Sequence, residues 1–277
     1  MYFDKTMAGD SHTALKAALQ WHLDHGADEA LLDEPVDHTA LRRPAMEPEA
    51  AMAKAVMPAT AVAEGPNLLA GTGEIAAQAA ALAAGCATLD ELKQAIADFD
   101  GLAVKKTATQ MVFADGDAAS SRIMLIGEAP GADEDRMGLP FVGVSGQLLD
   151  KILASINLAR RPEEGQQGVY ISNILNWRPP GNRTPSDQEI QIALPFIQKH
   201  IELAAPDFII LCGGVAAKGL LHSAESITKL RGRFHDMPVG GRVIPAMATY
   251  HPSYLLRTPS QKRAVWQDML MLQDRLA

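Results

Sequence analysis

Four short, mostly apolar runs give the second half of the chain its pattern, and a glycine or a polar residue lies at or near the end of each. They cover residues 123–126, 168–175, 207–214 and 243–252. Runs of this length, bounded by turn-forming residues, are typical of buried strands. Residues 147–158 and 187–204 carry apolar side chains at helical spacing. The alternation predicts an α/β fold, with a four-stranded parallel sheet and helices on both faces.

Polar side chains lie at the carboxyl ends of three of these runs. Glu128 follows the first run, Asn173 lies near the end of the second, and His251 lies at the end of the fourth. Right-handed crossovers would bring all three to one edge of the sheet, where open α/β sheets bind ligands. Pro130 and Gly131 predict a tight turn with accessible N–H groups. A carboxylate, such a turn and an aromatic ring close by indicate a pocket for a flat polar ligand, such as a nucleobase.

The first hundred residues have a different pattern. Leu15, Leu19 and Leu23 lie on one face of a predicted helix. We therefore predict an α-helical N-terminal extension over residues 1–42, an Ala/Pro-rich linker over 43–70 and the main domain over 71–277. Residues 74–99 are Ala-rich and predict two helices, the second starting at a capping box, Thr88-Leu-Asp-Glu91.

Charge also divides the chain, whose net charge is −8. Residues 1–100 hold 16 acidic and 6 basic side chains, whereas residues 101–277 hold 17 and 19. Arginine clusters in the second part could bind a phosphate backbone, or could be a solvated face. The chain has two cysteines, Cys86 and Cys212, and no apolar run long enough to span a bilayer. These features predict a cytoplasmic protein without a membrane partner.

Five motifs occur in the order seen in family 4 uracil-DNA glycosylases. They are Gly127-Glu-Ala-Pro-Gly131, Gly138-Leu-Pro-Phe-Val-Gly143, Tyr170-Ile-Ser-Asn173, Arg178-Pro-Pro-Gly-Asn-Arg183 and His251-Pro-Ser253. Residues 99–277 resemble this family, and most of all its alphaproteobacterial branch. The resemblance implies an enzyme of base excision repair that flips uracil out of DNA and hydrolyses its N-glycosidic bond. The partner would be DNA containing uracil, bound by a monomer, and no partner is predicted for the N-terminal extension.

The resemblance also implies roles for particular residues. Asn173 would read uracil, His251 would stabilise its developing O2 anion, and Glu128 would position water. The substrate-binding set would be Gly127, Ala129, Pro130, Gly131, Glu134, Phe141 and Asn182, with Phe141 stacking on the base. The DNA-binding set would be Arg178, Arg183, Ser253, Tyr254 and Arg257. The best-known uracil glycosylases carry Asp in place of Ala129 and Tyr in place of Gly131, so water activation and thymine exclusion would differ here.

Most of this family holds a [4Fe–4S] cluster on four cysteines. Aligning the motifs places these ligand positions near Phe99, Leu102, Trp177 and Ala193, which are all apolar. We therefore predict no cluster, no other metal and no cofactor, with an aromatic plug in the place of the metal.

Other interpretations remain open. Taken singly, each site residue could be structural: Asn173 could end a strand, and Phe141 could be core packing. A protein that binds uracil or abasic DNA with little turnover is the main alternative to an enzyme. A nucleotide-binding hydrolase lacks support, because the sequence has no Gly-Lys-Ser/Thr phosphate loop.

Overall fold

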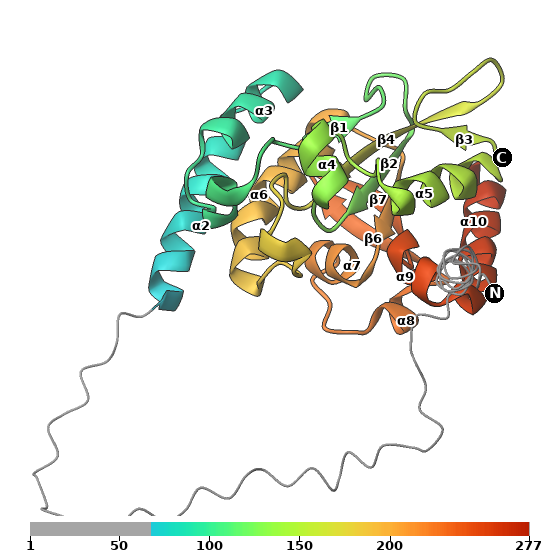
Figure 1. Cartoon of the computed structure of the whole chain (residues 1–277). Helices are drawn as coiled ribbons and strands as arrows, with labels where there is room; N and C mark the ends of the chain where they lie inside the picture. The colour runs from blue at the N-terminus through green and yellow to red at the C-terminus, as the bar shows by residue number, and fades with distance from the viewer. Residues whose placement is uncertain (1–67, 277) are drawn as a thin grey trace, which may run out of the picture. The chain divides into compact units, whose positions relative to one another are not determined.

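The structure, a computed structural model, describes residues 68–276, and its centre is a mixed β-sheet (Figure 1). The strand order is β1-β4-β2-β5-β7-β6, with β3 beside β4. The strands are β1 Ala114–Asp115, β2 Ile123–Gly127, β3 Leu158–Ala159, β4 Gln167–Asn173, β5 Phe208–Cys212, β6 Phe234–Val239 and β7 Arg242–Thr249. The four predicted strands are β4, β2, β5 and β7, and they are parallel. The edge strands β1 and β6 are antiparallel, and the sequence pattern did not predict them.

Alternation along the strands builds two hydrophobic layers. The side chains of Met124 and Ile126 belong to one buried cluster, together with residues of α2, α3, α6 and α7. Those of Ile123 and Leu125 belong to another, with residues of α5, α9 and α10. Because successive strand residues point to opposite faces, a continuous apolar run needs helices on both sides. The predicted two-sided α/β fold is confirmed (Figure 1).

Some of the helices begin where the sequence supplies a side-chain cap. Their bounds are α2 Leu68–Ala84, α3 Leu89–Asp98, α4 Ala132–Met137, α5 Val144–Ala154, α6 Asp187–Ala204, α7 Gly214–Leu220, α8 Ile227–Leu230, α9 Pro252–Arg257 and α10 Lys262–Leu276. Three short 3₁₀ helices are η1 Ala103–Thr107, η2 Pro180–Asn182 and η3 Pro259–Gln261. The capping box predicted at Thr88 and Glu91 is present at the start of α3, and a second, Ser186 with Glu189, starts α6.

Two sequence predictions concern the region at or before Leu68, where the described residues begin. Helix α2 begins at Leu68, three residues before the predicted start of the main domain at residue 71. The helix predicted around residues 13–25 and the linker before Leu68 lie outside the described residues. None of the helices within residues 68–276 combines the length and the apolar character needed to cross a membrane.

Candidate active site

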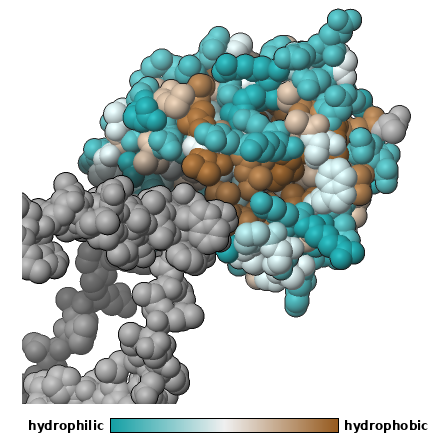
Figure 2. Space-filling model, turned by 45° about the vertical axis from the view of Figure 1, so that its right-hand side comes forward, coloured by the Kyte–Doolittle hydropathy of each residue, from teal (hydrophilic) through white to brown (hydrophobic). Residues whose placement is uncertain are grey.

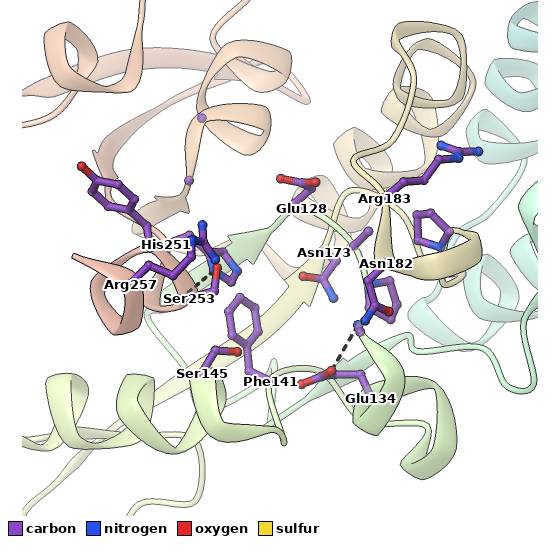
Figure 3. Close-up of a pocket in the computed structure, with 17 residues that line it drawn as sticks. Glu128, Glu134, Phe141, Ser145, Asn173, Asn182, Arg183, His251, Ser253 and Arg257 are labelled. Carbon is purple, nitrogen blue, oxygen red and sulfur yellow. Dashed lines mark hydrogen bonds between the residues drawn. The ribbon is translucent and has the colours of Figure 1, made fainter. Parts of the chain in front are cut away.

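A pocket of about 460 Å³ lies at the carboxyl ends of the parallel strands (Figure 3). Its lining residues are Glu128, Ala129, Pro130, Gly131, Glu134, Phe141, Ser145, Asn173, Pro179, Asn182, Arg183, Gly213, Gly214, His251, Ser253, Tyr254 and Arg257. The structure therefore brings together Glu128, Asn173 and His251, as the strand ends predict. Of the other predicted residues, only Gly127 and Arg178 do not line the pocket.

Strand pairing sets Glu128 beside Asn173. Gly127 is the register partner of Asn173 in the β2–β4 ladder, and the Leu175 N–H donates to the Glu128 carbonyl at 3.1 Å beyond the strand ends. A Cβ on Gly127 would come within 2.4 Å of the Asn173 side-chain oxygen and within 2.6 Å of the Phe141 ring. Gly127 therefore acts by allowing this close approach rather than by facing a ligand.

Asn173 offers its amide to the pocket. The residue is 2% exposed, and no group within residues 71–276 forms a hydrogen bond with its side chain. Every fully enclosed polar side-chain atom in the described residues has a partner. The amide of Asn173 therefore remains open to a hydrogen-bonding ligand.

Glu128 faces the same space as a second polar group without a protein partner in the described part of the chain. Burial raises the pKa of its carboxyl group above the usual value of 4.5, because a low-dielectric environment disfavours the charge. A carboxylate in this state binds water or a developing positive charge more strongly than an exposed one does.

His251 is held in one protonation state. It is the N-cap residue of α9, and its Nδ1 accepts from the Ser253 N–H at 3.2 Å. The proton of the neutral ring therefore resides on Nε2. Burial, followed by the positive charge of Arg257, lowers the pKa of His251 to about 4. At neutral pH the pocket thus has an uncharged N–H donor from this residue.

The Phe141 ring lies against His251, with ring centroids 5.3 Å apart and planes 27° from parallel. Phe141 comes from the loop between α4 and α5, and Figure 3 shows its ring pointing up toward Asn173 and His251. An aromatic face beside an open amide suits a planar heterocycle, which stacks and pairs at once.

Glu134 binds backbone amides with both of its side-chain oxygens. Its Oε1 accepts from the N–H groups of Val142 and Gly143 at 2.9 and 3.0 Å, and its Oε2 accepts from the Gly131 N–H at 3.1 Å. The carboxylate therefore ties the turn after β2 to the loop that carries Phe141. Glu134 lines the pocket, but three backbone donors already engage its oxygens.

The arginines after β4 also have protein partners. Arg178 donates from Nε to the Asn182 side-chain oxygen at 2.7 Å, and lies 3.9 Å from an Asp135 oxygen. Arg183 pairs with both oxygens of Glu189. By contrast, Arg257 lines the pocket and has no carboxylate partner within residues 71–276.

Sequence reasoning missed four lining residues: Ser145, Pro179, Gly213 and Gly214. Gly213 has φ +100°, and a Cβ there would lie 3.2 Å from the His251 Cβ. The sequence held one signal for these positions: the predicted strand at residues 207–214 ends in two glycines, which could have been assigned to the pocket.

Size alone does not select this pocket. A groove of about 490 Å³ lies between α5, α9 and α10, lined by apolar side chains that include Leu148, Ile152 and Trp266. Figure 2 turns the α10 side toward the viewer and shows hydrophobic atoms bordered by hydrophilic ones. The pocket at the strand ends differs from this groove in placing an open amide and a carboxylate beside an aromatic ring, and this is what specific recognition of a small polar molecule requires.

Comparison with known proteins agrees with this geometry. The family model of the uracil DNA glycosylase superfamily matches residues 113–270, more than half of the chain. The chain belongs to the uracil-DNA glycosylase superfamily. It is 33% identical over 187 residues to a type-4 uracil-DNA glycosylase of Pyrobaculum aerophilum, covering 66% of this chain and 92% of that protein. It is 39% identical over 164 residues to the type-4 enzyme of Thermotoga maritima, covering 58% and 80%. The resemblance to family 4 uracil-DNA glycosylases is confirmed.

The positions aligned with the family's cluster ligands do not fit an iron–sulfur site. Phe99, Leu102, Trp177 and Ala193 are all buried in the same hydrophobic cluster as α2 and α6. The chain has only two cysteines, and Cys86 and Cys212 belong to different clusters. The described residues contain no group of three or more His, Cys, Asp or Glu that could hold a metal. Four thiolates, which such a cluster needs, are not available.

Proposed function

We propose that this uracil-DNA glycosylase excises uracil from DNA with Asn173, His251 and Glu128 as its catalytic residues. One observation carries the proposal: the open amide of Asn173 lines the same pocket as His251 and Phe141, whose rings lie 5.3 Å apart. Uracil is planar and presents an acceptor, a donor and an acceptor along one edge. Relatives with this activity match most of the domain.

Recognition follows from hydrogen-bond polarity. The Asn173 oxygen would accept from uracil N3–H, and its nitrogen would donate to O4. Cytosine presents an amine and a bare ring nitrogen at the same two places, and so opposes an amide held in this orientation. Flipping the nucleotide out of the duplex gives the base access to the pocket, where the ring of Phe141 would stack on it.

Catalysis requires stabilisation of two charges. Cleavage of the bond between N1 and the sugar leaves electrons on uracil and an oxocarbenium-like sugar. The Nε2–H of neutral His251 would donate to O2 as its negative charge develops. Glu128 would stabilise the cationic sugar, orient the water that attacks it and accept this water's proton as the abasic product forms. The uracil anion would take up a proton from solvent, so that the base leaves neutral.

DNA contact would fall mainly on α9 and its start. Ser253, Tyr254 and Arg257 line the pocket mouth, and Leu256 is 43% exposed beside them. An exposed leucine on this helix suits the gap that a flipped base leaves in the duplex. Arg178 and Arg183 stay predicted DNA contacts, although their protein partners indicate a share in holding the loop after β4.

A multiple-turnover assay tests the function. Excess uracil-containing oligonucleotide, single-stranded or duplex, should yield many abasic products per enzyme, and a thymine oligonucleotide of the same sequence should yield none. Product that stops at or below one per chain would favour the alternative, a uracil-binding or abasic-binding protein. Oligonucleotides with hypoxanthine, xanthine or a thymine mismatch would define the substrate range.

The missing cysteines support a second part of the proposal, that the enzyme carries no iron–sulfur cluster. The bulk of Phe99 and Trp177 would fill the corresponding space, since an unfilled cavity in a core costs stability. Purified protein should be colourless and lack stoichiometric iron. About four irons per chain in anaerobically prepared protein would overturn this part.

A further inference from the structure

The backbone of Phe141 is strained. Its φ of +53° lies in the left-handed region, which a bulky side chain rarely adopts. Strain of this kind persists only where surrounding groups hold it, and it gathers at functional sites. The groups that hold this loop therefore decide where the ring lies.

Arg160 holds both carbonyls that flank the strained residue. Its Nη1 donates to the Pro140 carbonyl at 2.9 Å, and its Nη2 donates to the Phe141 carbonyl at 2.8 Å. The other side of the loop is held by Glu134, which accepts from the next two N–H groups in the chain. The Arg160 guanidinium on two carbonyls and the Glu134 carboxylate on two amides thus fix the backbone of residues 140–143.

Two carboxylates fix Arg160 in turn. Its guanidinium pairs with Asp115 at 3.0 Å and with Asp150 at 2.8 Å, and its side chain is 12% exposed. Every nitrogen of the fork has a partner in this arrangement. Arg161 is the natural control, because its side chain is 74% exposed and its one ion-pair partner within residues 71–276 is Asp115, at 3.4 Å.

We propose that Arg160 is a positioning residue, which holds Phe141 in the conformation that stacks a flipped base. The proposal rests on the proposed function. Arg160 does not line the pocket and acts only through the loop. Through the loop, Arg160 fixes the position of the Phe141 ring beside His251. The position of this ring sets how far the base enters the pocket toward Asn173.

The test compares Arg160→Gln with Arg161→Gln in the full chain. Arg160→Gln should lower kcat/KM for uracil excision by about 10- to 100-fold, the range that one base–aromatic stack spans. Inhibition by free uracil should weaken by a similar factor, because stacking also holds the product. Arg161→Gln should change either quantity less than about twofold, as expected of an exposed charge.

A double-mutant cycle with Phe141→Ala separates positioning from general stability. If Arg160 acts through the ring, Arg160→Gln should cost less than about threefold once the ring is gone. The proposal would be overturned if the rate losses of Arg160→Gln and Phe141→Ala multiplied in the double variant. It would also be overturned if Arg160→Gln kept full activity, or if free uracil inhibited this variant as strongly as wild type. Arg160→Lys keeps the charge and can reach one carbonyl, so its kcat/KM should lie between those of wild type and Arg160→Gln. If Arg160→Gln does not fold, Arg160→Lys should still show a kcat/KM below that of wild type.

One readout does not depend on the activity. Because the Phe141 ring lies 5.3 Å from the His251 ring, we expect it to shift the NMR signals of the His251 ring protons. Arg160→Gln should remove this shift, whereas Arg161→Gln should retain it. Unchanged His251 signals in Arg160→Gln would contradict the proposal. Absence of uracil release by the wild-type chain would instead count against the proposed function.

Discussion

Asn173 and Trp177 are four residues apart in the chain but belong to two regions with opposite demands. Asn173 lines a pocket in which an amide and the Glu128 carboxylate have no protein partner within the described residues. Trp177 is 9% exposed and belongs to a hydrophobic cluster that also contains Phe99 and Leu102. The pocket around Asn173 leaves polar groups available to a ligand, whereas the cluster around Trp177 is filled by apolar side chains.

The difference shows what fixes the residue type in each region. Polar groups without partners destabilise a fold, so residues such as Asn173 are explained by a ligand rather than by folding. The cluster around Trp177 needs apolar volume, which several residue types supply. Substitutions in the pocket should therefore lower activity and spare stability, and substitutions in the cluster should do the reverse.

The largest expected effect is on stability. Trp177→Ala should lower the free energy of unfolding by about 3–5 kcal/mol, because it leaves a cavity in a packed core. Urea unfolding followed by circular dichroism measures the loss, and excision by the folded fraction should stay within several-fold of wild type. A loss under about 1 kcal/mol would mean that the Trp177 site does not behave as a core position.

The next effect is on activity alone. Asn173→Ala and His251→Ala should each lower the single-turnover rate of uracil excision by about 100- to 1,000-fold, since each removes a donor to charge that develops in the transition state. Melting temperatures should change little. Rates near wild type in both variants would remove Asn173 and His251 from the catalytic set.

Both regions could be predicted from the sequence to the extent that spacing encodes them. Apolar runs that stop at a polar residue located Asn173 and His251, because strand ends meet at one edge of a parallel sheet. Strand β6 was missed because His235 and Asp236 interrupt its apolar pattern.

Contacts between distant loops could not be predicted. Nothing in the sequence indicated that the side-chain oxygens of Glu134 bind three backbone amides. Arg160 received no assignment, since its carbonyl partners lie about 20 residues away. Neither partnership leaves a periodic signal in the sequence.

A smaller effect should appear in the pH dependence of excision. The pKa of Glu128 is raised above 4.5, whereas that of His251 is lowered to about 4. As the pH falls, Glu128 is therefore protonated first, and kcat/KM should fall through the raised pKa of Glu128 while His251 stays neutral. Measurement between pH 4.5 and 8 should show this acid limb.

Glu128→Gln should remove the limb and lower the plateau by about tenfold, because an amide still orients water but carries no charge. A limb that persists unchanged in Glu128→Gln would assign the titration to another group.

The smallest effect should come from outside both regions. Residues 1–67 hold 11 acidic and 5 basic side chains, and like charges repel a phosphate backbone. We expect a chain starting at Leu68, which keeps α2 whole, to excise uracil from short oligonucleotides within several-fold of the full chain. Its melting temperature should be similar, and at low salt its KM should be equal or lower because repulsion is removed. Loss of soluble protein or of excision on this deletion would contradict the assignment of folding and catalysis to the main domain. The pocket and the cluster would then depend on a segment that the strand pattern does not include.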